Sequence, residues 1–286
     1  MSVANIARDY NAEAKEGQKA NFGICLQTFM NTNPGFEQRD ITSSDDITFQ
    51  MYTGMATGAT LFEYFCYRSY EGFGMYGIID ESGEKRIYDY VKEANDRALP
   101  FEKVLCSFEW KGLISNKGEM SGKDDVFGDL RDLELQDTGS FSDVDSRYDA
   151  IVGCFEKDGQ DGYMVVNYTD PINDFTNAVT LKFEGCSQAH VYTEDGTKQM
   201  NLTENGELRL ILEAGQGAFV IPKKGEKLEN EETEKGEKRI WHADVSEKKC
   251  HPIFDHYGDS GNLRNTQIFY NKCIFYSARI FRWGTI

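Results

Sequence analysis

Residues 22–69, FGICLQTFMNTNPGFEQRDITSSDDITFQMYTGMATGATLFEYFCYRS, decide the predicted fold. They predict a buried strand over 22–29, a helix over 45–58 and a second buried strand over 60–69. A second helix, EKRIYDYVKEANDRA, follows at 84–98. Two strand–helix units in succession indicate parallel α/β architecture. In such folds, polar groups at the C-terminal ends of the strands form the functional site.

The helix over 45–58 has a clear start and an unusual composition. Ser43 can cap the first backbone N–H groups, and the acid Asp46 follows three residues later. Gly54 and Gly58 would weaken an isolated helix by about 1 kcal/mol each relative to alanine. We therefore expect this helix to pack closely against a sheet.

The charge of the chain limits the classes of ligand. The 286 residues include 48 acidic and 31 basic side chains, for a net charge of −17. This argues against nucleic-acid binding, which needs clustered Lys and Arg, and against docking on an anionic membrane. A neutral carbohydrate is compatible with the charge. The 19 Phe and 15 Tyr can fill a core or line a sugar-binding groove.

The sequence also carries information on location. Seven cysteines are scattered without a CxxC pair, which predicts free thiols in a reducing compartment. No window reaches the roughly 18 apolar residues of a transmembrane span. A helix is expected over 2–18, with Gly17 as its end signal. Residues 1–18 lack the apolar core of a signal peptide. We expect a cytoplasmic protein.

Beyond residue 148 the pattern changes to short apolar strands about every ten residues, separated by Asp-Gly and Asn-Gly turns. This pattern predicts an antiparallel β-sandwich over 148–223. The polar segment 101–147 is interpreted as a connection between this sandwich and residues 1–100. Residues 224–286 are interpreted as a charged linker and a disordered tail.

In this order and spacing, the chain resembles the C-terminal part of β-galactosidase-like glycoside hydrolases of the family 42 type. The matching segments are FGICLQTF, DDITFQMYTGMATGATLFEYFCYRS and GIIDESGEKRIYDYVKEAN, and the resemblance covers about residues 5–222. It implies that 1–100 is a partial (β/α)8 barrel, the last two βα units, followed by the family's all-β domain. With six strands missing, residues 1–100 should be unstable alone, whereas 148–222 should fold independently.

The resemblance implies a retaining mechanism with two carboxylates, one from the fourth barrel strand and one at the end of the seventh. The strand that corresponds to the seventh ends here on Gln27, and an amide cannot form the glycosyl ester. Catalytic carboxylates are therefore not evident, and the catalytic residues are unknown. Gln27 is interpreted either as a contact to a sugar hydroxyl or as a polar strand-end residue that pairs with backbone.

Three further residues match substrate-contacting positions of the family. Tyr67 and Arg68 correspond to a Trp-Arg pair, which implies a stacking ring and a fork of donors, and Glu71 corresponds to an acidic position. The alternative is that Tyr67 and Arg68 pack in the core, with an ion pair to Glu63 or Asp80. Glu63 is expected to be a buried structural carboxylate, with a displaced catalytic acid as the other possibility.

The predicted function is that of a glycoside hydrolase fragment. The complete enzyme would hydrolyse O-glycosidic bonds of a β-linked oligosaccharide, and this chain is expected to be incomplete or inactive alone. The alternative is a non-catalytic carbohydrate-binding or interaction protein that keeps the sandwich. Another chain supplying the missing strands, or a homo-oligomer, is the expected protein partner. No cofactor or metal is expected, because His242, Cys250, His251 and His256 match no zinc-ligand spacing.

Overall fold

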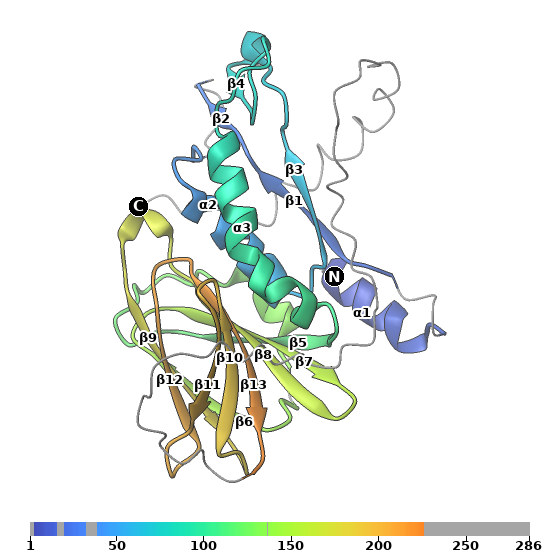
Figure 1. The fold of residues 1–286 in the computed structure, drawn as a ribbon, viewed down its shortest axis with the longest axis vertical. Helices are drawn as coiled ribbons and strands as arrows, with labels where there is room; N and C mark the ends of the chain where they lie inside the picture. Colours follow the sequence, from blue (N-terminus) through green and yellow to red (C-terminus); the bar gives the residue numbers. More distant parts are fainter. Residues whose placement is uncertain (1–2, 16–19, 33–38, 136, 226–286) are drawn as a thin grey trace, which may run out of the picture.

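The computed structural model describes residues 3–15, 20–32, 39–135 and 137–225. Figure 1 shows the helices and strands of residues 20–105 at one end of the molecule and the long strands of the later residues at the other. Helices are mixed with mostly antiparallel sheets. This confirms the predicted fold class, α/β plus all-β. The sheets of the described residues do not close into a barrel. Almost all of the predicted linker and tail lies outside the described residues.

A parallel strand–helix–strand unit forms the first part of the fold. β1 (Gly23–Gln27) and β3 (Leu61–Phe65) pair in parallel, and α2 (Ser44–Ala56) connects them. This confirms the order predicted from the sequence. Within the described part of the chain, β1 and β3 form a two-stranded sheet of their own, and no further barrel strand extends it.

The local sequence explains where α2 lies. The Ser43 backbone N–H donates to the Asp46 carboxylate over 3.1 Å, so the predicted cap is present at the helix start. A Cβ added to Gly54 would lie only 2.4 Å from Cδ1 of Ile24 in β1. The missing side chain therefore lets the helix approach the sheet closely. This packing offsets the low helix propensity of glycine.

The helix predicted over 84–98 differs from α3 (Tyr88–Leu105) at both ends. It begins later and continues through Pro100 to Leu105, whereas the sequence predicted an end at residue 98, before this proline. Proline removes one backbone hydrogen bond of the helix. Phe101 and Leu105 beyond it are buried, however, and their packing holds the added turn in place.

α1 (Val3–Glu13) takes the place of the helix predicted over 2–18, whose expected end at Gly17 is not among the described residues. The Asn5 side-chain amide donates to the Asp132 carbonyl over 3.0 Å. The Arg8 guanidinium lies 5.9 Å from the centre of the Trp110 ring. α1 is therefore held against the segment that leads into the sandwich.

The second part consists of two antiparallel sheets that share a buried core. The larger sheet has the order β11-β10-β13-β8-β7-β5, and the smaller has the order β12-β9-β6. Val152 and Val165 of the larger sheet are buried together with Val179, Leu181 and Leu210 of the smaller one. The strands are β5 (Glu109–Asn116), β6 (Phe141–Ser146), β7 (Ala150–Lys157), β8 (Gln160–Asn167), β9 (Asn177–Phe183), β10 (Gln188–Thr193), β11 (Gly196–Asn201), β12 (Glu207–Leu212) and β13 (Gly217–Lys223).

Two of these strands come from the segment 101–147, which the sequence placed between the two parts. β5 pairs with β7, and β6 pairs with β9, so each adds an edge to one of the sheets. Polar residues hid β6, and in β5 a bulge between Trp110 and Gly112 breaks the alternation of the strand. In β6 only Phe141 and Ser146 are buried.

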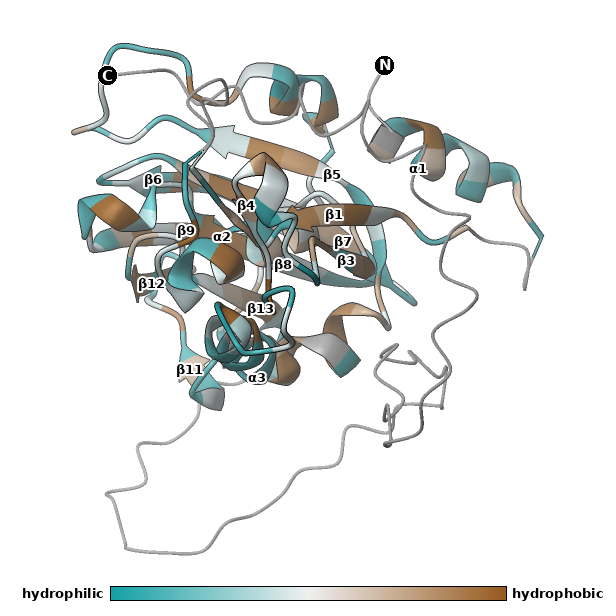
Figure 2. Ribbon diagram, turned by 90° about the horizontal axis from the view of Figure 1, so that it is seen from above, coloured by the Kyte–Doolittle hydropathy of each residue, from teal (hydrophilic) through white to brown (hydrophobic). Residues whose placement is uncertain are grey.

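The parallel unit and the larger sheet bury a common core. Ile47 and Tyr52 of α2 and Phe101 of α3 belong to one cluster with Met164 of β8 and Phe219 of β13. In Figure 2, β1 and β5 carry the hydrophobic colour over part of their length. α2 thus lies between the two-stranded sheet and the sandwich. This arrangement gives no support to the expectation that 148–222 folds independently.

Candidate functional site

β1 and β3 end at the same edge of their sheet. Gln27 lies beside Phe65 in the register, and the Thr28 backbone N–H donates to the Phe65 carbonyl over 2.7 Å. Because the strands are parallel, the residues that follow their C-terminal ends gather there. The loop after β3, residues 66–82, is called the β3 loop.

Gln27 is half-buried at the end of β1. Its backbone N–H donates to Gln50 Oε1 over 2.8 Å, and its carbonyl accepts from Gln50 Nε2 over 3.1 Å. Its own amide nitrogen donates to the carbonyls of Arg39 (2.6 Å) and Phe29 (3.2 Å). Gln27 therefore pairs with backbone, and Oε1 is the atom that can accept from a sugar hydroxyl.

The β3 loop is held by backbone hydrogen bonds. β2 (Met30–Asn31) pairs with β4 (Met75–Tyr76), and between β3 and β4 lies the short helix η1 (Glu71–Phe73). The Thr32 N–H donates to the Gly74 carbonyl over 2.8 Å. These bonds tie the loop to the segment that follows β1, so both strand ends contribute to one surface.

Tyr67 and Arg68 point out of the protein rather than into its core. The Tyr67 side chain is 61% exposed, so the core-packing alternative is wrong for this residue. Arg68 is also exposed, and its Nη2 donates to the Glu81 carbonyl over 2.6 Å. The expected ion pair with Glu63 or Asp80 is not found among the described residues. The Asp80 carboxylate lies instead 3.5 Å from Arg86.

Glu71 forms hydrogen bonds with Glu81, a residue that was not predicted from the sequence. The Glu71 backbone N–H donates to Glu81 Oε1 over 3.3 Å, and the Glu81 N–H donates to Glu71 Oε1 over 3.5 Å. Since Arg68 bonds the Glu81 carbonyl, Glu81 brings Arg68 and Glu71 to one place. The turn DESG at 80–83 was the available sequence signal, but it does not reveal which residues the turn meets.

Asp80 shapes the turn that presents Glu81. Its Oδ1 accepts from the Ser82 hydroxyl over 2.6 Å and from the Glu84 backbone N–H over 2.8 Å. The Ser82 hydrogen bond, together with the backbone bonds and the charge of Arg86, lowers the pKa of Asp80. Asp80 is therefore an ionised anchor of the turn at neutral pH.

Glu63 lies on the face of the sheet that α2 does not cover. Gly54 of α2 packs against Ile24 and Phe62, so the alternation of the strands places Gln27 and Glu63 on the opposite face. Glu63 is exposed, which corrects the expectation of a buried structural carboxylate. It is also the sole acid within β1 and β3. A two-carboxylate mechanism has no second group on these strands.

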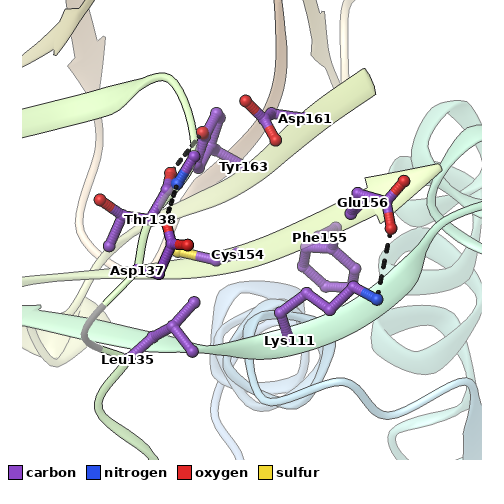
Figure 3. Close-up of a pocket in the computed structure, with 10 residues that line it drawn as sticks. Lys111, Leu135, Asp137, Thr138, Cys154, Phe155, Glu156, Asp161 and Tyr163 are labelled. Atoms are coloured by element: carbon purple, nitrogen blue, oxygen red, sulfur yellow. Dashed lines mark hydrogen bonds and ion pairs between the residues drawn. The ribbon is translucent and has the colours of Figure 1, made fainter. Parts of the chain in front are cut away.

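A separate cleft of about 350 Å³ lies in the sandwich (Figure 3). Lys111 is the extra residue of a β-bulge in β5, and its Nζ lies 3.3 Å from Glu156. The Tyr163 hydroxyl donates to the Thr138 carbonyl over 2.8 Å. Burial raises the pKa of the Cys154 thiol to about 12, so this thiol is neutral and unreactive at pH 7. The cleft is also lined by the carboxylates of Asp137, Glu156 and Asp161, so it offers charged and polar contacts, whereas its thiol is not a nucleophile at pH 7.

No three His, Cys, Asp or Glu side chains of the described residues come together as a metal site. The Cys250 and His251 group is not among these residues. None of the described helices combines the length and apolar composition of a membrane-spanning segment.

Comparisons with known proteins add no family assignment. No model of a protein family matches the chain, and no curated protein matches it.

Proposed function

We propose that this chain is the C-terminal part of a β-galactosidase-like glycoside hydrolase and binds β-linked carbohydrate at the β3 loop. One observation carries this proposal: Arg68 and Glu71 both bond Glu81 on the loop that also carries the exposed Tyr67 ring, at the C-terminal edge of parallel strands. The ring offers a face for the apolar side of a pyranose. The guanidinium and carboxylates donate to and accept from its hydroxyls.

The chain is proposed to bind sugar without hydrolysing it alone. Retaining hydrolysis requires two carboxyl groups about 5–5.5 Å apart. β1 and β3 provide Glu63 and the amide of Gln27 instead. Gln27 Oε1 accepts hydrogen bonds but cannot serve as the usual nucleophile.

In this proposal β1, α2, β3 and α3 are the last two βα units of a (β/α)8 barrel. A second chain with the remaining strands, or a homo-oligomer, would complete the sheet. Two considerations support this. A two-stranded sheet is marginal in water, and parallel sheets are normally covered on both faces. Here Cys25 and Glu63 are exposed on the uncovered face.

A cytoplasmic location belongs to the same proposal. Cys66, Cys154 and Cys186 are thiols rather than disulfides. Thiols of this kind are typical of a reducing compartment.

Sugar binding is tested with the full chain and two series of probes. Nitrophenyl galactoside, glucoside and arabinoside should remain uncleaved. Galacto- and cello-oligosaccharides should bind in an NMR titration, and Tyr67→Ala should weaken that binding. Tyr10→Ala is the matched control, since Tyr10 is 54% exposed on α1.

Two outcomes would contradict the proposal. Absence of binding to every sugar, or equal effects of the two tyrosine variants, would favour the alternative of an interaction protein that keeps the sandwich. Turnover of a nitrophenyl glycoside that disappears in Gln27→Ala would show that the chain is an enzyme by itself.

A further inference from the structure

The two most exposed aromatic side chains of the described residues lie on the same loop. Phe73 is 74% exposed and Tyr67 is 61% exposed, and both belong to the β3 loop. Among the described residues, neither ring is paired with another aromatic ring. A single exposed aromatic residue is common on protein surfaces, but two on one loop beside polar groups indicate a contact surface.

The backbone around Phe73 is well defined. The Phe73 N–H donates to the Tyr70 carbonyl, and the Gly74 N–H donates to the Glu71 carbonyl, both over 2.9 Å. Gly74 has a φ of 69°, a conformation that glycine adopts readily, and it ends η1 there. The exposure of Phe73 therefore results from a fixed turn. Such a turn forgoes the burial of a large apolar side chain.

We propose that Phe73 is a second stacking surface on the loop that carries Tyr67, so that the β3 loop binds a chain of at least two neutral sugar units. This inference rests on the proposed function. Each ring can cover the apolar face of one pyranose. Glu71, which lies between the two rings in the sequence, and Arg68 supply acceptors and donors for the hydroxyls.

The charge of the loop selects the class of sugar. Glu71 and Glu81 are both exposed, and Arg68 adds one positive charge beside them. These residues therefore carry an excess of negative charge, and the net charge of the whole chain, −17, has the same sign. An acidic sugar chain would be repelled, whereas a neutral one would not.

Binding of sugars of increasing length by the full chain tests the inference. The probes are galactose, β-1,4-galactobiose and β-1,4-galactotriose, with the corresponding gluco-series, in NMR titrations. Phe73→Ala should lower the affinity for the di- and trisaccharides about tenfold and leave the monosaccharide unchanged. Tyr67→Ala should weaken binding at every length. Phe175→Ala, at a position 41% exposed on the sandwich, is the matched control and should change none of these affinities.

The outcomes separate this inference from the proposed function. If Phe73→Ala binds every length like the unmodified chain while Tyr67→Ala does not, the second stacking surface is excluded and the proposed function stands. If the unmodified chain binds no sugar, both are overturned. Galacturonic acid oligomers that bind as tightly as galactotriose would overturn the preference for neutral sugars. Unchanged thermal unfolding of Phe73→Ala would show that a loss of affinity is local.

Discussion

The carbonyl oxygen of Ala56 lies directly against Gly153, where an added Cβ would be only 2.2 Å away. Trp110 Nε1 donates to the same oxygen over 3.0 Å. The end of α2 thus meets β7 at a residue without a side chain and β5 through a hydrogen bond. These contacts join the parallel unit to the sandwich.

Gly153→Ala tests this junction. The added methyl group would collide with the Ala56 carbonyl and force α2 away from β7. Such overpacking should lower the free energy of unfolding by about 1–3 kcal/mol, measured in urea. Gly122→Ala is the control, because an added Cβ there has no atom within 4 Å. Equal unfolding free energies for the two variants would show that the junction is not tight.

Residues 148–225 expressed alone should not fold cooperatively. This fragment lacks β5 and β6. It would also expose Ile151, Met164 and Phe219, which are fully buried in the chain beneath the helices. We expect strong binding of a hydrophobic dye and no sharp thermal transition. A cooperative transition like that of the full chain would instead support the original expectation of an independent sandwich.

Arg97 on α3 links three elements. Its Nε donates to Glu194 in the turn between β10 and β11, and its Nη1 donates to Asp45 on α2 over 2.6 Å. Glu194→Gln removes the charge of a carboxylate that is 13% exposed. We expect a loss of about 1–2 kcal/mol in unfolding free energy.

The control for Glu194→Gln is an exposed pair on the same helix. Lys92 and Asp96 lie 2.6 Å apart, and both side chains are more than half exposed. Asp96→Asn should leave the stability unchanged, because solvent screens such pairs. If both variants unfold like the unmodified chain, the Arg97 contacts do not hold the helices to the sandwich.

The stability of the chain should fall on mild acidification because of His190. Burial, together with the charge of Lys223, lowers the pKa of His190 below its usual value of about 6.5. The unfolded chain therefore takes up this proton at a higher pH than the folded chain does. The stabilising contribution is present above about pH 6.5 and is lost as the pH falls through the folded pKa.

Urea unfolding between about pH 7.5 and pH 5 checks this sign. The unmodified chain should lose more unfolding free energy over this range than His190→Gln does. Lys223→Gln should show a smaller loss than the unmodified chain, because one cause of the shift is removed. Parallel pH profiles of all three proteins would mean that His190 does not contribute.

Much of the first part of the fold could be predicted because its signals are local. Ser43 and Asp46 mark the start of α2, and the apolar runs on either side of it mark β1 and β3. The extension of α3 beyond Pro100 could not be predicted, since it depends on the burial of Phe101 against other elements. Strand β6 was missed because it is mostly polar, and β5 because a bulge between Trp110 and Gly112 breaks its alternation.

Some residues of the candidate site could also be predicted from the sequence, and others could not. Tyr67 and Arg68 lie at the C-terminal end of the strand predicted over 60–69, so their place at the edge of the sheet could be anticipated, although β3 itself ends at Phe65. Glu81 could not, because its bonds to Arg68 and Glu71 span thirteen and ten residues of an irregular loop. Glu63 was misplaced because an acid within an apolar run gives no sign of which face of the sheet is covered.

By itself, the sequence determined the order of β1, α2, β3 and α3 and the edge at which polar groups follow the parallel pair. These features depend on neighbours a few residues apart, through side-chain periodicity and capping. Only the tertiary structure decided that α2 lies between the two-stranded sheet and the sandwich, and that Glu81 joins Arg68 to Glu71. Such contacts join residues distant in the chain, and their fit depends on the shapes of both surfaces.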